Sequence, residues 1–261
     1  RHLVALGGFV ASFAVNYQCE DLRFHRIFIV AEEFCRAEFF AKVKPEGVCR
    51  CATGAFPRRA GAFFLFCHAG GEAIAVQADV SNAKQVEAMF EATIDAFGKP
   101  DILVNSAGIM INKPIAETTD EDFDRIFAIN VKGTFNTLRE AATKLNDGGR
   151  VVNLSSITTR MLLPSYGTYC ATKGAVDQLT RIFAKEVGER NITVNAVSPG
   201  PTDTELFHQG KADDTAKRLA SMSPFNRIGE PVDIPRVVAF LVSEEAACVT
   251  GQNIGANGGT A

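Results

Sequence analysis

Several features that would assign this 261-residue chain to a class are missing from its sequence. No stretch approaches the roughly 18 apolar residues that a membrane-spanning helix needs. No basic run is present, and the net charge of -3 argues against a nucleic-acid-binding surface. Residues 26–40, RIFIVAEEFCRAEFF, contain no glycine, although the chain has 22. We therefore expect neither a membrane span nor a nucleic-acid partner.

The seven cysteines lack the spacing of a metal site or of a disulfide framework. Five lie before residue 70, and none forms a CxxC pair. Cys49, Cys51 and Cys67 with His68 could be combined into a metal cluster, but their spacing matches no standard ligand set. We therefore expect scattered reduced thiols, no metal and a cytoplasmic location.

The beginning of the chain has a pattern that would suit a secreted protein instead of a cytoplasmic one. Arg1 and His2 precede an apolar run, LVALGGFVASFAV, at residues 3–15. A basic residue followed by about a dozen apolar ones is also the pattern of a secretory signal peptide. No small-x-small cleavage site follows, so residues 1–25 are interpreted as an extension, with secretion as the alternative.

Composition changes at Gly70-Gly71. The residues up to this point hold 11 of the 20 Phe and carry nine Lys/Arg against six Asp/Glu, whereas the remainder carries 18 against 24. The apolar pattern is irregular before the change and regular after it. A chain of this length can nevertheless bury the core of one large α/β domain, so we expect a single domain over residues 1–261.

From residue 72, short apolar runs alternate with longer helical patterns. Strands are predicted over residues 72–80, 101–108, 150–156, 192–200 and 252–259. Helices are predicted over residues 79–98, 118–145 and 169–190, where apolar residues recur every three or four positions. This alternation predicts a Rossmann-like α/β fold, a doubly wound parallel sheet between two helical layers (three-layer αβα). Ligands of such sheets bind at the carboxyl ends of the strands.

Tyr169 and Lys173, in YCATK, are four residues apart at the start of a helical pattern. That spacing puts both side chains on one helix face. A phenol is a poor base at neutral pH, but a neighbouring ammonium favours the phenolate and lowers the pKa of the phenol. The pair is therefore a candidate proton relay.

Further motifs accompany this pair. Ser156 lies at a strand end, twelve residues separate it from Tyr169, and Asn130 stands within a helical pattern although Asn is a mediocre helix former. In order and spacing, Asn130, Ser156, Tyr169 and Lys173 resemble the tetrad of the short-chain dehydrogenase/reductase family. NSAG at 105–108, ADV at 78–80 and SPGPTDT at 198–204 resemble its NNAG, adenine-contacting and nicotinamide-contacting segments, with Ser106 replacing an Asn. The resemblance covers residues 71–259.

The resemblance implies a role for each tetrad residue. Tyr169 would donate a proton to the carbonyl in reduction and remove it in oxidation. Lys173 would bind the nicotinamide ribose, and Ser156 would hydrogen-bond the carbonyl oxygen. Asn130 would hold a water that links Lys173 to solvent. The implied cofactor contacts are Asp79, Val80, Asn105, Ala107, Gly108, Tyr169, Lys173, Pro199, Gly200 and Thr202.

Simpler interpretations exist for several residues. Tyr166 has Cys170 rather than a lysine four residues on, so it is interpreted as part of the pocket rim. Ser155 is a second candidate serine, but the twelve-residue gap favours Ser156. Asp79 and Asn105 could be turn residues. His208, in the segment that caps the substrate in the family, is interpreted as a surface residue.

The glycine-free stretch conflicts with the resemblance. The family binds the cofactor pyrophosphate with a TGxxxGxG loop, whose glycines let backbone N–H groups approach the phosphates. The spacing to Asp79 puts that loop at about Ala31, where the residues are AEEFCRAEF, with Glu32 and Glu33 next to the phosphates. A strand at 27–30, a helix at 32–43 and a strand at 47–52 are still predicted. Arg58 and Arg59, just beyond, favour a 2′-phosphate.

Three hypotheses account for this anomalous half of the cofactor site, residues 26–70. Residues 1–70 as written could differ from the true chain, for example through reading out of frame. The segment could bind the cofactor in an unusual way. The chain could also have lost the cofactor, although the intact tetrad argues against that.

The function expected from these residues is NAD(P)(H)-dependent interconversion of an alcohol and a ketone or aldehyde, with NADP(H) favoured over NAD(H). The alternative within enzymes is a 3-oxoacyl-thioester (acyl carrier protein) reductase. The alternative from another class is a non-catalytic dinucleotide-fold scaffold or regulator. The resemblance implies a homotetramer built through helices at about 120–146 and 169–189, and a small-molecule carbonyl or alcohol substrate.

Overall fold

The computed structural model describes residues 5–6, 9–16, 26–31, 72–204, 207 and 213–261. The strands are β1 (Ala5–Leu6), β2 (Phe9–Asn16), β3 (Arg26–Ala31), β4 (Glu72–Ala78), β5 (Ile102–Ser106), β6 (Arg150–Leu154), β7 (Thr193–Pro199) and β8 (Asn253–Ala256). They join in one sheet, in which β3, β5, β6, β7 and β8 pair in parallel and in chain order. The predicted strand at 27–30 is thus confirmed as β3.

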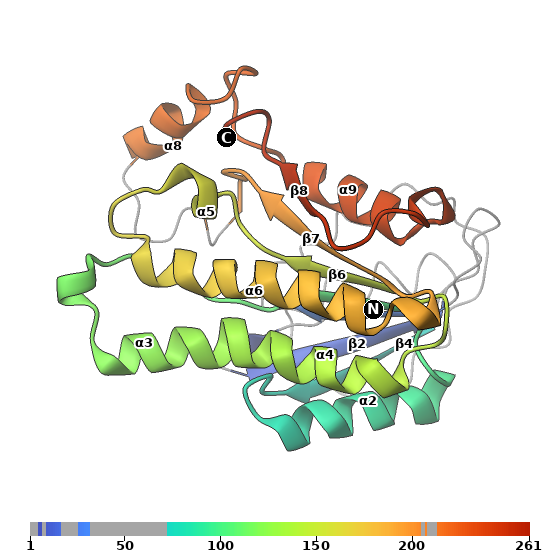
Figure 1. The fold of residues 1–261 in the computed structure, drawn as a ribbon. Coiled ribbons are helices and arrows are strands. Elements are labelled where there is room, and N and C mark those ends of the chain that lie inside the picture. Colours follow the sequence, from blue (N-terminus) through green and yellow to red (C-terminus); the bar gives the residue numbers. More distant parts are fainter. Residues whose placement is uncertain (1–4, 7–8, 17–25, 32–71, 205–206, 208–212) are drawn as a thin grey trace.

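The parallel strands have the composition of strands covered on both faces. Nearly every residue of β5, β6 and β7 is buried, because helices lie on both sides of the sheet (Figure 1). The five strands predicted from residue 72 onward are confirmed as β4 to β8, and so is the doubly wound α/β fold.

One edge of the sheet differs from the prediction of a wholly parallel sheet. Residues 9–16, part of the expected extension, form β2, which pairs antiparallel with both β3 and β4. The run FVASFAVN is rich in Val and Phe, which favour strands, and this composition explains why these residues form a strand. The predicted helix at 32–43 and strand at 47–52 lie outside the described residues, as do Arg58, Arg59 and His208.

The longer helices are α2 (Ala83–Phe97), α4 (Gly133–Lys144), α6 (Gly167–Glu186) and α9 (Asp233–Val242), and the shorter helix α3 (Asp120–Phe127) precedes α4. Short elements are α5 (Thr158–Met161), α8 (Asp213–Ala220), the 3-10 turns Ile115–Glu117, Gly188–Arg190 and Glu244–Ala246, and η3 (Ala128–Lys132), a π-helical turn. Helices α2, α4 and α6 cover one face of the sheet, and α9 covers the other (Figure 1). None of the helices among the described residues is long and apolar enough to cross a membrane.

The core joins the sheet to these helices. Phe90 and Met89 of α2, Leu103 of β5, Val152 of β6 and Leu241 of α9 are all buried and belong to one hydrophobic cluster. The predicted helix at 118–145 is divided by η3 into α3 and α4. Because β5, β6 and β7 are parallel and in register, their carboxyl ends meet at one edge of the sheet. The residues that follow these three strands are therefore brought together there.

Candidate active site

Helix α6 carries Tyr169 and Lys173 on the face that packs toward the sheet. Both side chains are buried, with 8% and 6% of their surface exposed. The Nζ atom of Lys173 lies 5.7 Å from the centroid of the Tyr169 ring and donates a 2.7 Å hydrogen bond to the backbone oxygen of Leu154, the last residue of β6. The spacing predicted from the sequence therefore places ammonium and phenol next to each other.

Ser156, two residues beyond β6, lies next to the phenol of Tyr169. The two side chains line the same cavity, and the Ser156 hydroxyl acts to lower the pKa of the phenol. The Oγ atom of Ser156 also accepts hydrogen bonds from the backbone N–H and the hydroxyl of Thr158, at 3.2 and 3.0 Å. Ser155, the second candidate, instead donates to the backbone oxygen of Lys173 at 3.4 Å. The twelve-residue gap thus selected the serine that meets Tyr169.

Asn130 lies in the π-helical turn η3 and is 1% exposed. Its side chain exchanges two hydrogen bonds with the backbone of Ile109, accepting at 2.8 Å and donating at 2.9 Å, and also donates to the Thr172 hydroxyl at 3.0 Å. Its backbone oxygen accepts from Thr134. π-Turns inside α-helices are frequent at functional sites. Here the turn fixes Asn130 against the segment that follows β5.

The pKa values of the two α6 residues are both shifted by burial. Burial raises the pKa of Tyr169 to about 12, and the Ser156 hydroxyl acts in the opposite direction. Burial lowers the pKa of Lys173 to about 8, and the charge of Asp177 opposes this effect. The expectation that the pKa of Tyr169 is lowered is therefore wrong: burial of the phenol is the largest influence on this pKa, and it raises it. At neutral pH the phenol is protonated.

A cavity of about 300 Å³ opens above these residues. Ser156, Tyr169 and Lys173 line it together with Gly108, Pro199, Gly200 and Thr202. Most of the remaining wall is apolar: Val104, Met110, Leu154, Ile157, Met161, Leu163, Phe207, Leu219, Pro231, Ile234, Pro235 and Val238. Tyr166 also lines the cavity, which agrees with its interpretation as a rim residue. The cavity can hold an apolar molecule with one polar group directed at Ser156 and Tyr169.

The expected adenine contacts lie away from this cavity. The Asp79 carboxylate accepts hydrogen bonds from the backbone N–H and the hydroxyl of Ser81, at 2.9 and 2.7 Å, in a turn after β4. Val80 is buried, and its backbone oxygen accepts from Asn136 of α4. Neither Asp79 nor Val80 is among the described residues that line the cavity. Both remain predicted contacts for the far end of a dinucleotide.

In the NSAG segment, Asn105 anchors β5 and Gly108 borders the cavity. Asn105 donates to the side chain of Asn153 at 2.8 Å, and Asn153 donates to Thr180 of α6 at 2.9 Å. The Asn105 side chain therefore ties β5 to β6 and α6. Ala107 packs against the core, and Gly108 borders the cavity. A Cβ atom on Gly108 would lie 3.2 Å from Oδ1 of Asn130, so glycine lets the segment after β5 pack closely against Asn130.

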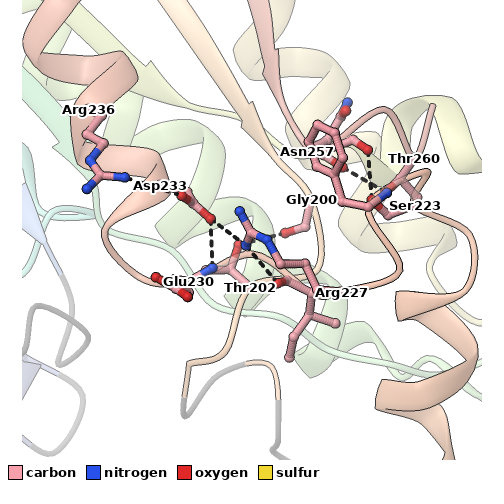
Figure 2. Close-up of polar contacts among 12 residues, drawn as sticks. Gly200, Thr202, Ser223, Arg227, Glu230, Asp233, Arg236, Asn257 and Thr260 are labelled. Carbon is pink, nitrogen blue, oxygen red and sulfur yellow. Dashed lines mark hydrogen bonds and ion pairs between the residues drawn. The ribbon is translucent and has the colours of Figure 1, made fainter.

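The segment after β7 is fixed by a second polar cluster, shown in Figure 2. Gly229 donates from its backbone N–H to Pro201 O at 2.7 Å, and its own oxygen accepts from Asp203 N at 2.9 Å. An ion pair between Arg227 Nη1 and Asp233 Oδ2, at 2.8 Å, closes the loop that carries Gly229 (Figure 2). These contacts hold residues 201–203 beside the N-terminus of α9.

Within this segment the predicted contact residues form a tight turn. The Thr202 hydroxyl is buried and donates to Gly200 O at 2.9 Å (Figure 2). A Cβ atom on Gly200 would lie 2.8 Å from the Cα atom of Asn257, so only glycine fits there. Pro199 accepts at its backbone oxygen from Ile157 N, which joins the ends of β6 and β7. Three predicted contacts thus share one wall of the cavity.

Sequence reasoning did not identify three polar residues behind the tetrad. Thr158 fixes the Ser156 hydroxyl, Thr172 bonds Asn130, and Asp177 carries a charge that acts on Lys173. Thr172 and Asp177 follow the Tyr169 face of α6 at helical spacing, and this spacing is the signal that could have found them. Thr158 carries no such signal, because it belongs to a separate element.

The chain is similar in sequence to known proteins over most of its length. A family model described as enoyl-(acyl carrier protein) reductase matches residues 64–261. A chloroplastic NADPH-dependent aldehyde reductase-like protein of Arabidopsis thaliana is 46% identical over 195 residues, which are 73% of this chain and 72% of that protein. A short-chain type dehydrogenase/reductase of Picea abies is 42% identical over 194 residues, 73% of this chain and 72% of that protein.

A similar solved structure is that of the angucycline C-6 ketoreductase LanV with bound NADP. It is 39% identical, has a TM-score of 0.64, and the match covers 69% of this chain and 72% of that one. Family model, relatives and structure agree with the parallel sheet and the helices on both its faces. The chain therefore belongs to the short-chain dehydrogenase/reductase family of oxidoreductases.

Proposed function

We propose that this enzyme interconverts an alcohol and a ketone or aldehyde with NADP(H). The observation that carries the proposal is the placement of Ser156 and Tyr169 in the wall of one largely apolar cavity, with the Lys173 ammonium 5.7 Å from the centroid of the phenol ring. Two hydroxyl groups directed at one point form a site for a single carbonyl oxygen. Further support comes from the names of two similar proteins, an aldehyde reductase-like protein and a ketoreductase.

Each residue of the site has a chemical task in reduction. Tyr169 donates its phenolic proton to the carbonyl oxygen, and Ser156 donates a hydrogen bond to that oxygen as negative charge develops on it. The raised pKa of Tyr169 keeps the phenol protonated before the reaction, as an acid requires. The Lys173 ammonium stabilises the phenolate that remains. Asn130, in the π-turn, would hold a water that returns a proton through Lys173.

The nicotinamide end of the cofactor fits the residues around this point. Gly108 borders the cavity next to Asn130 and Lys173, and Pro199, Gly200 and Thr202 also line it. The bound cofactor would supply the hydride. NADP(H) is preferred because LanV was solved with NADP and the Arabidopsis relative is named NADPH-dependent. Asp79 and Val80 are proposed contacts of the adenine end.

A 3-oxoacyl-thioester reductase is the second candidate. The description of the matching family model names an acyl carrier protein reductase, and the same Ser-Tyr-Lys site would serve a 3-oxo group. A substrate attached to a carrier protein would need only its acyl part inside the cavity. Comparing turnover of a free ketone with that of a 3-oxoacyl thioester separates the two candidates.

We also propose a homotetramer in the cytoplasm. Phe135 of α4, Val131 of η3, and Leu179 and Ile182 of α6 line an apolar groove on the outer surface of the helical layer. The side chains of Phe135 and Ile182 are 47% and 58% exposed, and a second copy of this chain would bury them. Cys170 and Cys248 are free thiols, which agrees with a reducing compartment.

The decisive experiment follows NADPH oxidation with aromatic and aliphatic ketones and aldehydes. The wild-type protein should turn over at least one of them, and Tyr169→Phe should lose on the order of 10²-fold or more in kcat while still binding NADPH. Tyr166→Phe is the matched control, since it removes a hydroxyl from the same cavity without removing the proton donor. Full turnover by Tyr169→Phe would contradict the proposal, and an absence of binding of both NADPH and NADH to the wild type would favour a non-catalytic role.

A further inference from the structure

Thr158, the first residue of α5, donates two hydrogen bonds to one atom, the Oγ of Ser156. Its backbone N–H group bonds that oxygen at 3.2 Å and its hydroxyl at 3.0 Å. Both residues are buried, and both line the cavity of the candidate active site. A serine hydroxyl has two acceptor lone pairs and one proton. Because Thr158 uses both lone pairs, the proton is what the Ser156 hydroxyl has left to offer a ligand.

The groups around Ser156 favour this direction of the two hydrogen bonds. A backbone N–H group can only donate, so the first bond has one possible direction. Ser156 is the hydrogen-bond partner of the Thr158 hydroxyl among the described residues, so a reversed second bond would leave the Thr158 proton without an acceptor in that part of the protein. A buried donor without an acceptor is destabilising. Thr158 is therefore the donor and Ser156 the acceptor.

Thr158 is itself held from the side of α6. Its backbone oxygen accepts a hydrogen bond from Sγ of Cys170, at 3.2 Å, and another from Leu162 N, also at 3.2 Å. Cys170 directly follows Tyr169 in α6. Thr158 therefore connects the Ser156 hydroxyl to the turn of α6 that carries the phenol.

We infer that Thr158 is a positioning residue for Ser156: by donating to both lone pairs of the Ser156 hydroxyl, it directs the Ser156 proton toward the carbonyl oxygen of the substrate. A carbonyl oxygen has two lone pairs and no proton, so it can accept from Ser156 and from Tyr169 together. The inference rests on the proposed function for its effect on turnover, whereas the direction of the hydrogen bonds exists without substrate. Thr158 transfers no proton and acts through Ser156.

The direction of the hydrogen bonds is measured in the wild-type protein without ligands. Neutron diffraction from crystals of the deuterated protein locates the hydroxyl deuterons directly. We expect the Thr158 deuteron on the line to Ser156 Oγ, and the Ser156 deuteron directed into the cavity. A Ser156 deuteron on the line to Thr158 Oγ1 would overturn the inference, whatever the activity of the protein.

Turnover supplies the second readout. Thr158→Val keeps the shape and the backbone N–H group but removes the hydroxyl donor, and it should lower kcat for carbonyl reduction by about five- to tenfold, the effect of one hydrogen bond. Thr158→Ser keeps the donor and should restore kcat. Thr159→Val is the matched control, since the Thr159 hydroxyl donates to the backbone oxygen of Ser156, at 3.0 Å, and not to its side chain. This control should leave kcat unchanged.

A double-mutant cycle separates positioning from packing. Ser156→Ala should lower kcat on the order of 10²-fold. In that background Thr158→Val should have no further effect, because the hydroxyl through which Thr158 acts is missing. NADPH binding, followed by fluorescence, should be equal in all these variants, so that the loss of kcat cannot come from a disturbed cofactor site.

The outcomes separate this inference from the proposed function. An unchanged or raised kcat in a folded Thr158→Val variant would overturn the inference, and so would an equal loss in the Ser156→Ala background. If Thr158→Val does not fold, Thr158→Ala provides the same test. The expected deuteron directions with no wild-type turnover of any carbonyl compound would instead refute the proposed function and leave the effect of Thr158 on Ser156 intact.

Discussion

Gly108 lies directly against Asn130: a Cβ atom at position 108 would stand 3.2 Å from Asn130 Oδ1 and 3.5 Å from Lys173 Nζ. Asn130 cannot move aside freely, because the same Oδ1 accepts a 2.8 Å hydrogen bond from Ile109 N. The segment after β5 and the π-turn η3 are thus in contact at the point where the cavity meets α6.

Gly108→Ala should therefore displace Asn130 or Lys173 and lower kcat by about tenfold to a hundredfold, since small displacements in an active site carry large costs. The measurement is steady-state NADPH oxidation. Gly174→Ala is the matched control: it lies on α6 next to Lys173, but its Cβ would meet nothing within 4 Å. We expect unchanged kcat and a stability gain of about 0.5–1 kcal/mol for this control, because alanine favours a helix interior.

The kcat/KM for carbonyl reduction should fall at alkaline pH. The pKa of Lys173 is about 8 and that of Tyr169 about 12, so Lys173 loses its charge first as pH rises. In the free enzyme, kcat/KM for carbonyl reduction should fall through about pH 8, whereas the phenol remains protonated. A profile with no decline below pH 10 would contradict the assignment of that limb to Lys173.

The same two groups predict how stability changes with pH. Between about 8 and the unfolded value of 10.5, the unfolded chain keeps a proton at Lys173 that the folded chain has lost, so this lysine makes stability rise with pH. Between 10.0 and about 12, the folded chain keeps the Tyr169 proton that the unfolded chain loses, so stability falls. Thermal unfolding of wild type against Lys173→Met tests the first window, since the variant should lack the rise.

The ion pair between Arg227 and Asp233 should act on cofactor binding rather than on chemistry. It closes the loop that holds residues 201–203 (Figure 2), and both side chains are partly exposed, so it contributes little to global stability. Arg227→Met should raise KM for NADPH about two- to fivefold with kcat nearly unchanged. Arg236→Met is the control, because its contact with Asp233 is longer, at 3.8 Å. Equal effects of both variants would argue against a specific role for Arg227.

The apolar groove on α4 and α6 predicts the assembly state. Ile182→Glu places a charge among Phe135, Val131 and Leu179 and should shift the protein from tetramer to smaller species in light-scattering measurements. Ile115→Glu makes the same change at an exposed position outside the groove and should leave the mass unchanged. A wild-type monomer would refute the proposed tetramer.

Some parts of the fold could be predicted from the sequence, and others could not. The strands from residue 72 onward and the helices between them follow from local periodicity, and the structure confirms them. The π-turn that divides the helix at 118–145 was not predicted, because apolar spacing does not report where backbone hydrogen bonding changes register. The place of β2 was not predicted either, since strand pairing joins residues 9–16 to residues 72–78 and depends on long-range contacts.

Within the site, the sequence by itself determined the pairing of Tyr169 with Lys173, because four residues on one helix impose it. It also selected Ser156 over Ser155 through a fixed spacing. Only the tertiary structure decided the contacts of Asn130 with Ile109 and Thr172, and the contact of Ser155 with the backbone oxygen of Lys173. It also decided the direction of the Tyr169 pKa shift, which the sequence reading had reversed. The physical reason is that desolvation and hydrogen bonding between elements depend on which distant residues pack together, and no local pattern contains that information.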